Sequence, residues 1–338
     1  MPRYIGVDLH TNCFTACVVD GRAKQTFRDY KLAEIAQFVA RLRSRDQVAV
    51  EATGNTRFFC DQLAGKVQRV AVVNPRAFEV VKRSASKTDK RDAANLALFL
   101  SKELLPEARK KDKGQAALTS LVQTRDKLVK QRTALINKLH ALEVSHGRQM
   151  YKERCASEAG LESVLADRWE TVERVEVEVI VAQVRSLNAG IKRLEGEITE
   201  QESKLEGHQN LTSIKGIGRT SATILLSVIG DIADFDSEAK LASYFGIVPS
   251  VRQSNETRHT GRITKGGSKL GRTTLVQCTL VAIRYSPYLK KYYDRLKARR
   301  GAGKAIIATA RKLLGIIYQT LKNKWVFVDF PNFVLAKE

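Results

Sequence analysis

Four carboxylates in the first hundred residues have the types and spacing of a metal site. Asp8 lies at the end of one apolar, β-rich stretch, and Glu51 ends a second one. Asp89 and Asp92 stand where an apolar helical pattern begins, and a separation of three places both on one helix face about 5–6 Å apart. Such oxygen ligands suit two Mg ions about 3.5–4 Å apart, which stabilise the attacking and leaving oxygens in phosphodiester displacement. We therefore expect Asp8, Glu51, Asp89 and Asp92 to bind Mg and to take part in catalysis.

Each of these carboxylates has a plainer explanation when it is taken alone. An Asp after an apolar strand is usually a turn residue, and Asp89 could simply cap the helix that follows it. His10 is weak evidence for proton transfer, because it is a lone histidine. Four converging anions would repel one another without a cation. The set as a whole therefore favours a metal site.

The elements that must position these carboxylates have the order of an RNase H-like fold. Three strands come first, then a helix, then strands that alternate with helices. The expected strands cover residues 3–9, 12–20, 24–30, 47–51 and 69–73. A doubly wound nucleotide-binding sheet would instead place a helix and a glycine-rich turn after its first strand. We expect an α/β domain over residues 1–112, followed by domains that are mostly helical.

A long helical region follows, with leucine, isoleucine and valine at steps of three and four. This pattern predicts a coiled-coil domain over residues 113–206, with a break near 147–165 that includes Gly160. Arg125, Arg132 and Gln201 fall on its seam and would help to fix the register. A coiled coil needs a partner helix, which we expect both within the chain and in another protomer.

The charge of the chain indicates a nucleic-acid partner. Lys and Arg number 58 against 36 Asp and Glu, a net charge of +22. Residues 1–100 carry 17 basic and 10 acidic side chains, and residues 241–338 carry 19 and 4, so the middle is neutral. The five scattered cysteines form no CxxC pair, which makes a zinc site or a disulfide framework unexpected. We expect a cytosolic protein, because no signal pattern and no membrane-spanning apolar run is present.

Two segments of the last third have features of a nucleic-acid interface. The stretch LTSIKGIGRTSATILLSVIG (211–230) resembles a helix-hairpin-helix, in which Lys215, Gly216 and Gly218 would contact a phosphate. An ordinary helical turn with a glycine cap is an equally good explanation. A basic loop follows a short helix at 237–245. Its cations would position phosphates or stabilise transition-state charge: Arg252, Arg258, Arg262, Lys265 and Arg272. A further helical region is expected over 271–325, interrupted at 301–304.

Three N-terminal motifs and one C-terminal stretch together resemble the DEDD-type insertion-sequence transposases. The N-terminal motifs are GVDLH (6–10), VAVEATG (48–54) and KTDKRDAANLA (87–97), and the C-terminal stretch covers 230–272. The resemblance implies that the N-terminal domain is RuvC-like and that residues 207–338 form a C-terminal transposase domain.

The resemblance also implies a serine recombinase that is guided by a structured bridge RNA pairing with donor and target DNA. The position that matches the family's nucleophilic serine is Ser254, with Ser250 and Ser268 as neighbouring alternatives. Asn255 follows Ser254, where the family commonly has glycine. A homo-oligomer is implied, either a dimer or a tetramer, that acts at the bacterial nucleoid.

Two other functions remain open at this point. In a hydrolytic RuvC-like nuclease, water would attack and Ser254 would be an ordinary loop serine. In a non-catalytic scaffold, the chain would bind RNA or DNA without Mg. The tyrosines of RYSPYLKKYYDRL (284–296) are better explained by stacking or core packing than by a tyrosine-recombinase mechanism.

Overall fold

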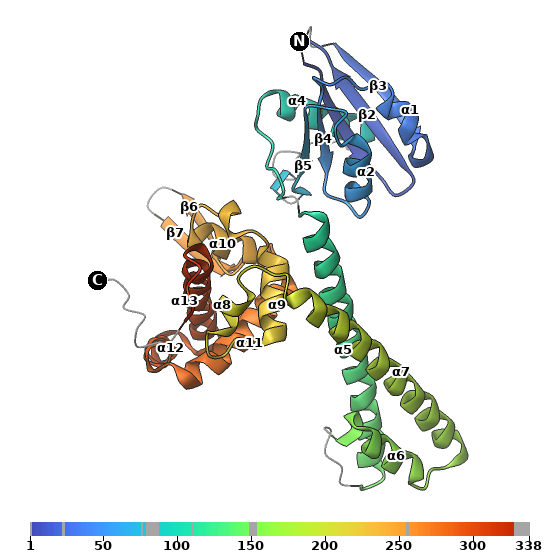
Figure 1. The fold of residues 1–338 in the computed structure, drawn as a ribbon, viewed down its shortest axis with the longest axis vertical. Helices are drawn as coiled ribbons and strands as arrows, with labels where there is room; N and C mark the ends of the chain where they lie inside the picture. The colour runs from blue at the N-terminus through green and yellow to red at the C-terminus, as the bar shows by residue number, and fades with distance from the viewer. Residues whose placement is uncertain are drawn as a thin grey trace. The chain divides into compact units, whose positions relative to one another are not determined.

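The protein is described by a computed structural model, which covers residues 2–21, 24–75, 77–78, 88–109, 111–148, 154–254 and 257–327. The chain divides into two compact units, residues 1–110 and residues 111–338 (Figure 1). The division into three domains stays a prediction.

The first unit is built on a five-stranded mixed sheet with the order β3-β2-β1-β4-β5. Its strands are β1 (Tyr4–Leu9), β2 (Cys13–Val19), β3 (Gln25–Lys31), β4 (Gln47–Glu51) and β5 (Arg69–Val73). The pairs β1–β2 and β2–β3 are antiparallel, whereas β1–β4 and β4–β5 are parallel. The helices are η1 (Leu32–Glu34), α1 (Ile35–Val39), α2 (Thr56–Leu63) and α4 (Asp89–Ser101). All five predicted strands are present, in the predicted order.

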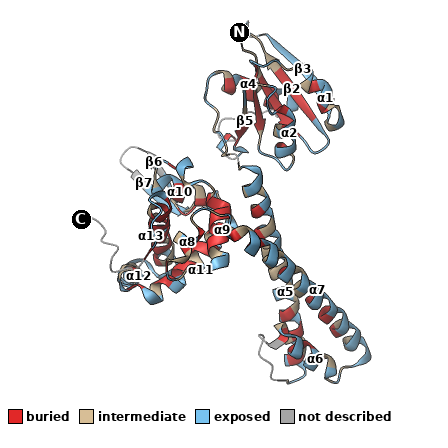
Figure 2. Cartoon of the chain, in the orientation of Figure 1, coloured by how far each residue is buried: buried red, intermediate tan, exposed pale blue. Residues whose placement is uncertain are grey.

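The two faces of this sheet are covered by different helices, and Figure 2 shows the buried strands between them. On one face, Phe14 packs edge-on against Phe38 of α1 and Phe59 of α2. On the other face, Ala49 and neighbouring small residues pack against Leu96 of α4. The small side chains on this second face let α4 lie close to the sheet.

Gly6 sets the distance between β1 and α4. A Cβ atom on Gly6 would lie 2.0 Å from the carbonyl oxygen of Ala93 and 2.5 Å from the amide nitrogen of Ala97. Only a glycine therefore leaves room for the helix. Since side chains alternate along a strand, Asp8 faces the same side as Gly6 and points toward α4.

The second unit begins with two long helices, α5 (Lys113–Ser145) and α7 (Thr171–Glu202), which pack against each other. Arg125 Nε donates to Glu195 Oε1 at 2.9 Å, and Arg132 donates to Asn188 Oδ1 at 3.0 Å, so both predicted seam arginines bind α7. Gln201 instead donates to Glu197 on its own helix.

The connection between these helices contains η2 (Arg154–Ala156) and α6 (Glu158–Ala166). The predicted break near 147–165 between the two long helices is confirmed, because α5 ends at Ser145 and α7 begins at Thr171. Gly160 lies in the first turn of α6, where its amide donates to the capping hydroxyl of Ser157.

The rest of the second unit is mostly helical. Its helices are α8 (His208–Thr212), α9 (Arg219–Ile229), η3 (Ile232–Asp234), α10 (Glu238–Phe245), α11 (Lys269–Tyr285), α12 (Pro287–Arg300) and α13 (Ala302–Lys322). Leu225, Phe245, Leu275 and Leu313 belong to its fully buried core. The hydroxyl of Thr119 on α5 donates to the Ser227 carbonyl at 2.9 Å, which ties α5 to α9.

The structure corrects two expectations in this region. The predicted basic loop begins with a β-hairpin of β6 (Pro249–Ser254) and β7 (Thr257–Ile263), with Arg252 opposite His259. Its strands are polar on both faces, so they lack the alternation of apolar residues that marks a half-buried strand. The expected 271–325 helical region also has an unforeseen break at Ser286, whose hydroxyl caps α12 by accepting from the Leu289 amide. The predicted interruption at 301–304 is confirmed by Gly301, where φ is +79°.

Across the part of the chain that the structure describes, no helix combines the length and the apolar character needed to cross a membrane.

Candidate functional site

Two neighbouring strands carry the first two predicted carboxylates to one end of the sheet. Asp8 lies near the end of β1, and Glu51 is the last residue of β4. These strands are parallel with Val7 opposite Val50, so Asp8 and Glu51 occupy the next positions along each strand. Matching positions of a parallel pair present their side chains on the same face. Both carboxylates therefore point toward the face that α4 covers.

The other two carboxylates lie in the first turn of α4. Thr88 is the N-cap, and its hydroxyl accepts from the Arg91 amide at 3.3 Å. The plainer explanation of Asp89 as the cap is therefore wrong. The side chain of Asp89 is 62% exposed, whereas Asp92 is buried with 6% of its surface exposed. Negative side chains in this turn are also favoured by the helix dipole.

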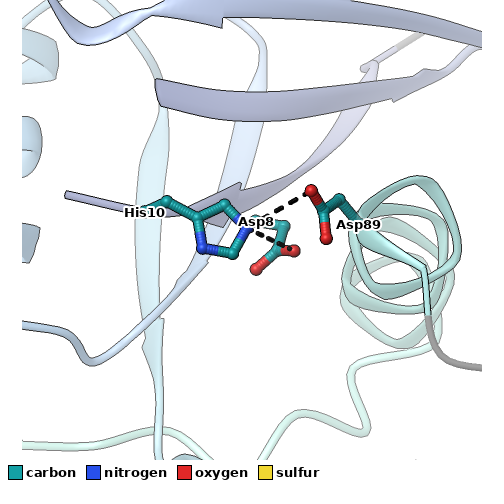
Figure 3. Close-up of side chains that lie close together, drawn as sticks. All are labelled: Asp8, His10 and Asp89. Carbon is teal, nitrogen blue, oxygen red and sulfur yellow. Dashed lines mark ion pairs between the residues drawn. The ribbon is translucent and has the colours of Figure 1, made fainter. Parts of the chain in front are cut away.

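Asp8, His10 and Asp89 meet in one cluster, shown in Figure 3. Nε2 of His10 lies 3.4 Å from Asp8 Oδ2 and 3.4 Å from Asp89 Oδ2. The three ligand atoms all lie within 4.8 Å of one another. Among the described residues, this is the one group of three or more such side chains that meets this distance, and Glu51 and Asp92 fall outside it.

His10 is the member of this cluster that sequence reasoning set aside. His10 comes two residues after Asp8 and directly after the end of β1 at Leu9, so strand alternation would place both side chains on the same face. Its amide donates to the Cys13 carbonyl at 2.9 Å, and its own carbonyl accepts from Asn55 Nδ2 at 2.8 Å. The spacing of two residues between Asp8 and His10 was the signal in the sequence, but only the tertiary structure shows that Asp89 also lies beside the imidazole.

The donor set of this end of the sheet fits a divalent metal ion. Carboxylate oxygens from Asp8 and Asp89 approach each other from a strand and a helix, as the DEDD pattern predicts. Two anions brought together in this way gain from a cation between them. Hard oxygen donors match Mg, for which Glu51 and Asp92 would be further ligands on the same face.

A thiol near this site can be left out of the ligand set. Cys17 lies opposite Gly6 in the β1–β2 register and is fully buried beside Ala93 and Ala97 of α4. Burial raises the pKa of the Cys17 thiol to about 11. The thiol is therefore neutral at physiological pH in the metal-free protein, and Cys17 is not part of the Asp8–His10–Asp89 cluster.

The predicted nucleophile lies in the hairpin of the second unit. Ser254 is the last residue of β6, and its side chain lies outside the described part of the chain, as do those of Arg252 and Arg258. Arg262 and Lys265 are exposed and follow on β7 and just after it.

Two residues near the hairpin have structural contacts of their own. The guanidinium of Arg272 donates to the carbonyl oxygens of Phe245 (3.1 Å) and Gly267 (2.7 Å), which holds the segment before α11. The hydroxyl of Ser268 accepts from the Gly271 amide at 3.1 Å as the N-cap of α11. Ser268 therefore has a capping role.

The two glycines of the GIG segment differ in their surroundings. Gly216 has a φ of +108°, and a Cβ there would lie 2.7 Å from the backbone nitrogen of Ala282 on α11. A Cβ on Gly218, the N-cap of α9, would meet no atom within 4 Å. Lys215 is exposed beside them. Gly216 is thus required for packing, whereas Gly218 leaves the end of α9 open.

Two family models match this chain. One, for DEDD transposases of the IS110 type and described as "Transposase", matches residues 5–143. The other, described as "Transposase IS116/IS110/IS902 family", matches residues 208–294. The first covers the strands and the helix that carry the DEDD carboxylates. Its domain is RNase H-like, which confirms the fold class expected for the N-terminal domain. Transposases of this type use divalent metal ions.

Relatives of similar length match over nearly the whole chain. The transposase for insertion sequence element IS1111A of Coxiella burnetii is 27% identical over 334 residues, which cover 95% of this chain and 90% of the relative. A pilin gene-inverting protein of Moraxella lacunata is 28% identical over 348 residues, covering 96% and 97%. With the two family models, these matches show that the chain belongs to the IS110 family of insertion-sequence transposases.

Proposed function

We propose that this transposase is a site-specific DNA recombinase in which Asp8, Glu51, Asp89 and Asp92 hold Mg and Ser254 attacks the DNA backbone. The observation that carries the proposal is the meeting of Asp8 and Asp89 at the end of an RNase H-like sheet. A relative named as a pilin gene-inverting protein supports recombination rather than simple hydrolysis, because inversion requires cut strands to be rejoined.

The carboxylates and the serine have separate parts in this mechanism. Bound Mg would stabilise charge on the attacking and leaving oxygens. Asp8 and Asp89 would hold the metal ion in a defined position, because Asp8 lies on a strand and Asp89 lies on a helix packed against that strand. A serine hydroxyl is a weak nucleophile and needs such activation.

The proposed reaction needs no added energy source, because each phosphoester bond that breaks is replaced by a new one. Ser254 Oγ forms a bond to phosphorus and gives up its proton, while the phosphorus–oxygen bond to the leaving strand breaks and that oxygen takes a proton. The protein–DNA ester keeps the energy of the broken bond. A strand hydroxyl then attacks the same phosphorus, releases Ser254 and seals the new junction.

The proposal also includes a guide RNA and a homo-oligomer. We propose that a structured bridge RNA selects donor and target DNA, and that a dimer or tetramer pairs the serine of one subunit with the tetrad of another. The packing of α5 on α7 supports a coiled-coil domain over 113–206. We place the protein in the bacterial cytoplasm, acting at the nucleoid.

The exposed face of α12 supports DNA as the partner of the second unit. Six of its fourteen residues are basic and one is acidic: Lys290, Lys291, Arg295, Lys297, Arg299, Arg300 and Asp294. All six cations are exposed, and among the described residues none of them forms an ion pair with a carboxylate. Cations that are not neutralised within the protein raise the affinity for phosphates by releasing counterions.

The salt dependence of DNA binding tests this face. The Arg299→Gln/Arg300→Gln variant should reduce the slope of log K against log salt by about 1.8, which corresponds to two phosphate contacts. Lys192→Gln/Arg193→Gln on α7 removes two equally exposed cations and is the matched control. An equal reduction in both variants would mean that α12 has no special part in binding.

The central experiment is to trap the covalent intermediate. With a DNA substrate carrying its recombination site, the wild-type protein should form a denaturation-resistant protein–DNA adduct, and Ser254→Ala should not. Cleavage that persists in Ser254→Ala and is lost in Asp8→Asn would show a hydrolytic nuclease instead. Ser250→Ala is the matched control for loss of a nearby hydroxyl.

Two further measurements separate the remaining parts of the proposal. Sequencing of RNA that co-purifies with the protein should give one structured species with segments complementary to DNA, and a random mixture would argue against guidance. Mixing inactive Ser254→Ala and Asp8→Asn proteins should restore activity if subunits share a site. The absence of any rescue would place the serine and the tetrad in the same subunit.

A further inference from the structure

We propose that His10 is a ligand of the metal ion held by Asp8 and Asp89, and that it gives the site a stronger preference for Mn²⁺ over Mg²⁺ than carboxylates alone would. The inference rests on the metal site of the proposed function and adds a nitrogen donor to it. The DEDD pattern consists of four carboxylates and assigns no role to this histidine.

The first support is the position of the imidazole relative to the two carboxylates. Nε2 of His10 is 3.4 Å from Asp8 Oδ2 and equally far from Asp89 Oδ2. Ligand atoms bonded at about 2.1 Å to one octahedral ion lie roughly 3.0 Å apart when adjacent and about 4.2 Å apart when opposite. The observed separations fall between these values. The three ligand atoms all lie within 4.8 Å of one another, which is the neighbourhood of a single ion.

A direct hydrogen bond explains this arrangement less well. Good N–H···O bonds measure about 2.7–3.2 Å between heavy atoms, which is shorter than either contact of His10 Nε2. One Nε2–H could also point at only one of the two carboxylates. A position at the same distance from Asp8 and Asp89 is compatible with three ligands around a common centre (Figure 3).

The second support is that the backbone of His10 is fixed from two sides. Its amide donates to the Cys13 carbonyl, and its carbonyl accepts from the side chain of Asn55. Asn55 is the N-cap position of α2, four residues after Glu51. The His10 backbone is therefore tied to β2 and to the segment that follows Glu51, which keeps the point of attachment of the imidazole beside the carboxylates.

The chemistry of the donor set predicts the metal preference. Mg²⁺ prefers oxygen ligands and retained waters, whereas an imidazole nitrogen suits transition metals. Mn²⁺ accepts the same carboxylates as Mg²⁺ and also accepts nitrogen. Replacing one oxygen by His10 Nε2 should therefore cost Mg²⁺ binding more than it costs Mn²⁺ binding.

Pulsed electron paramagnetic resonance on the full-length protein with Mn²⁺ as the probe tests the assignment. The electron spin echo of bound Mn²⁺ should show modulation from a directly bonded ¹⁴N nucleus. In protein labelled with ¹⁵N-histidine, the modulation should move to ¹⁵N frequencies. His10→Ala should remove the modulation and weaken Mn²⁺ binding by about tenfold or more, while Mg²⁺ binding changes less.

Three further proteins make the result specific. His140→Ala removes a partly exposed histidine on α5 and should leave the spectrum unchanged. His10→Asn keeps a polar side chain of similar length and should also lose the nitrogen modulation, so a general disturbance of the turn is separated from loss of a ligand. Asp8→Asn should abolish Mn²⁺ binding at this site.

The outcomes separate this inference from the proposed function. Mn²⁺ bound in an Asp8-dependent way without nitrogen modulation would overturn the role of His10 and leave the carboxylate site intact. Modulation that survives in His10→Ala would overturn it as well. Failure of Mn²⁺ to bind in any Asp8-dependent way would contradict the metal site itself.

Discussion

Replacing Gly6 by alanine should separate α4 from β1 and so take the metal site apart without touching a ligand. The new Cβ would lie 2.0 Å from the Ala93 carbonyl oxygen and 2.8 Å from the Leu96 Cβ. Since real Cβ atoms essentially never come within 3.0 Å of a non-bonded heavy atom, a shift of at least about 1 Å is needed.

The helix, not the strand, should make this movement. Gly6 pairs with Cys17 on one side and with Ala49 on the other, so β1 is held by hydrogen bonds to both of its neighbours. The first turn of α4 carries Asp89 and would move with the helix, away from Asp8. Displacements of about 1 Å cost enzymes on the order of a hundredfold in rate.

Two measurements on Gly6→Ala give the size of the effect, one on the stability of the fold and one on the affinity of the metal site. The free energy of unfolding from urea titration should fall by about 1–3 kcal/mol, which is the usual cost of overpacking. Mn²⁺ affinity should fall together with recombination activity. Gly54→Ala is the matched control, because a Cβ there meets nothing within 4 Å. A Gly6→Ala protein with unchanged stability and metal affinity would refute the reasoning.

Further predictions concern the second unit and the cysteines. Gly216→Ala should lower the free energy of unfolding by about 1–3 kcal/mol, because the φ of Gly216 is +108° and α11 fills the space that a Cβ would occupy. Gly218→Ala should change the free energy of unfolding by less than about 0.5 kcal/mol in the same denaturation experiment. Burial raises the pKa of Glu143, whose Oε1 has no hydrogen-bond partner, so the folded state keeps a proton that the unfolded state releases above a pH of roughly 4.3. The free energy of unfolding should then fall as pH rises from the unfolded-state pKa toward the raised pKa of Glu143 in the folded state. Glu143→Gln should be more stable than wild type by about 1 kcal/mol at pH 7.5 but not at pH 4. Equal stability of the two proteins at pH 7.5 would contradict this. At pH 8, iodoacetamide should label the exposed Cys13 in the folded protein. Cys17, whose pKa is raised to about 11 by burial, should be labelled only after the protein unfolds. Mass spectrometry that finds both cysteines labelled in the folded protein would count against this.

Much of the first unit could be predicted from local sequence patterns. Short β-rich runs separated by turns marked all five strands, and their order indicates the RNase H-like class without any knowledge of tertiary contacts. The positions of Asp8 and Glu51 at strand ends also followed, because a strand end is a local property. Asp89 and Asp92 followed from the start of an apolar helix, although Thr88 proved to be its cap.

Other features had no local signal. The β6–β7 hairpin was expected as a loop, because strands that are polar on both faces show no apolar alternation. The close packing of Gly6 on α4 depends on residues about ninety positions apart, so the sequence marks only a glycine within a strand. The contact of His10 with Asp89 likewise joins residues about eighty positions apart, so the sequence does not mark it.

The carboxylate set of Asp8, Glu51, Asp89 and Asp92 was thus determined by the sequence, as residue types at the ends of predictable elements. Which of these side chains meet was decided only by the tertiary structure, which joins Asp8 and Asp89 to His10. The physical reason is that strand and helix periodicity orient a side chain relative to its own element, whereas the distance between elements is set by packing. That distance depends here on a single missing methyl group at Gly6.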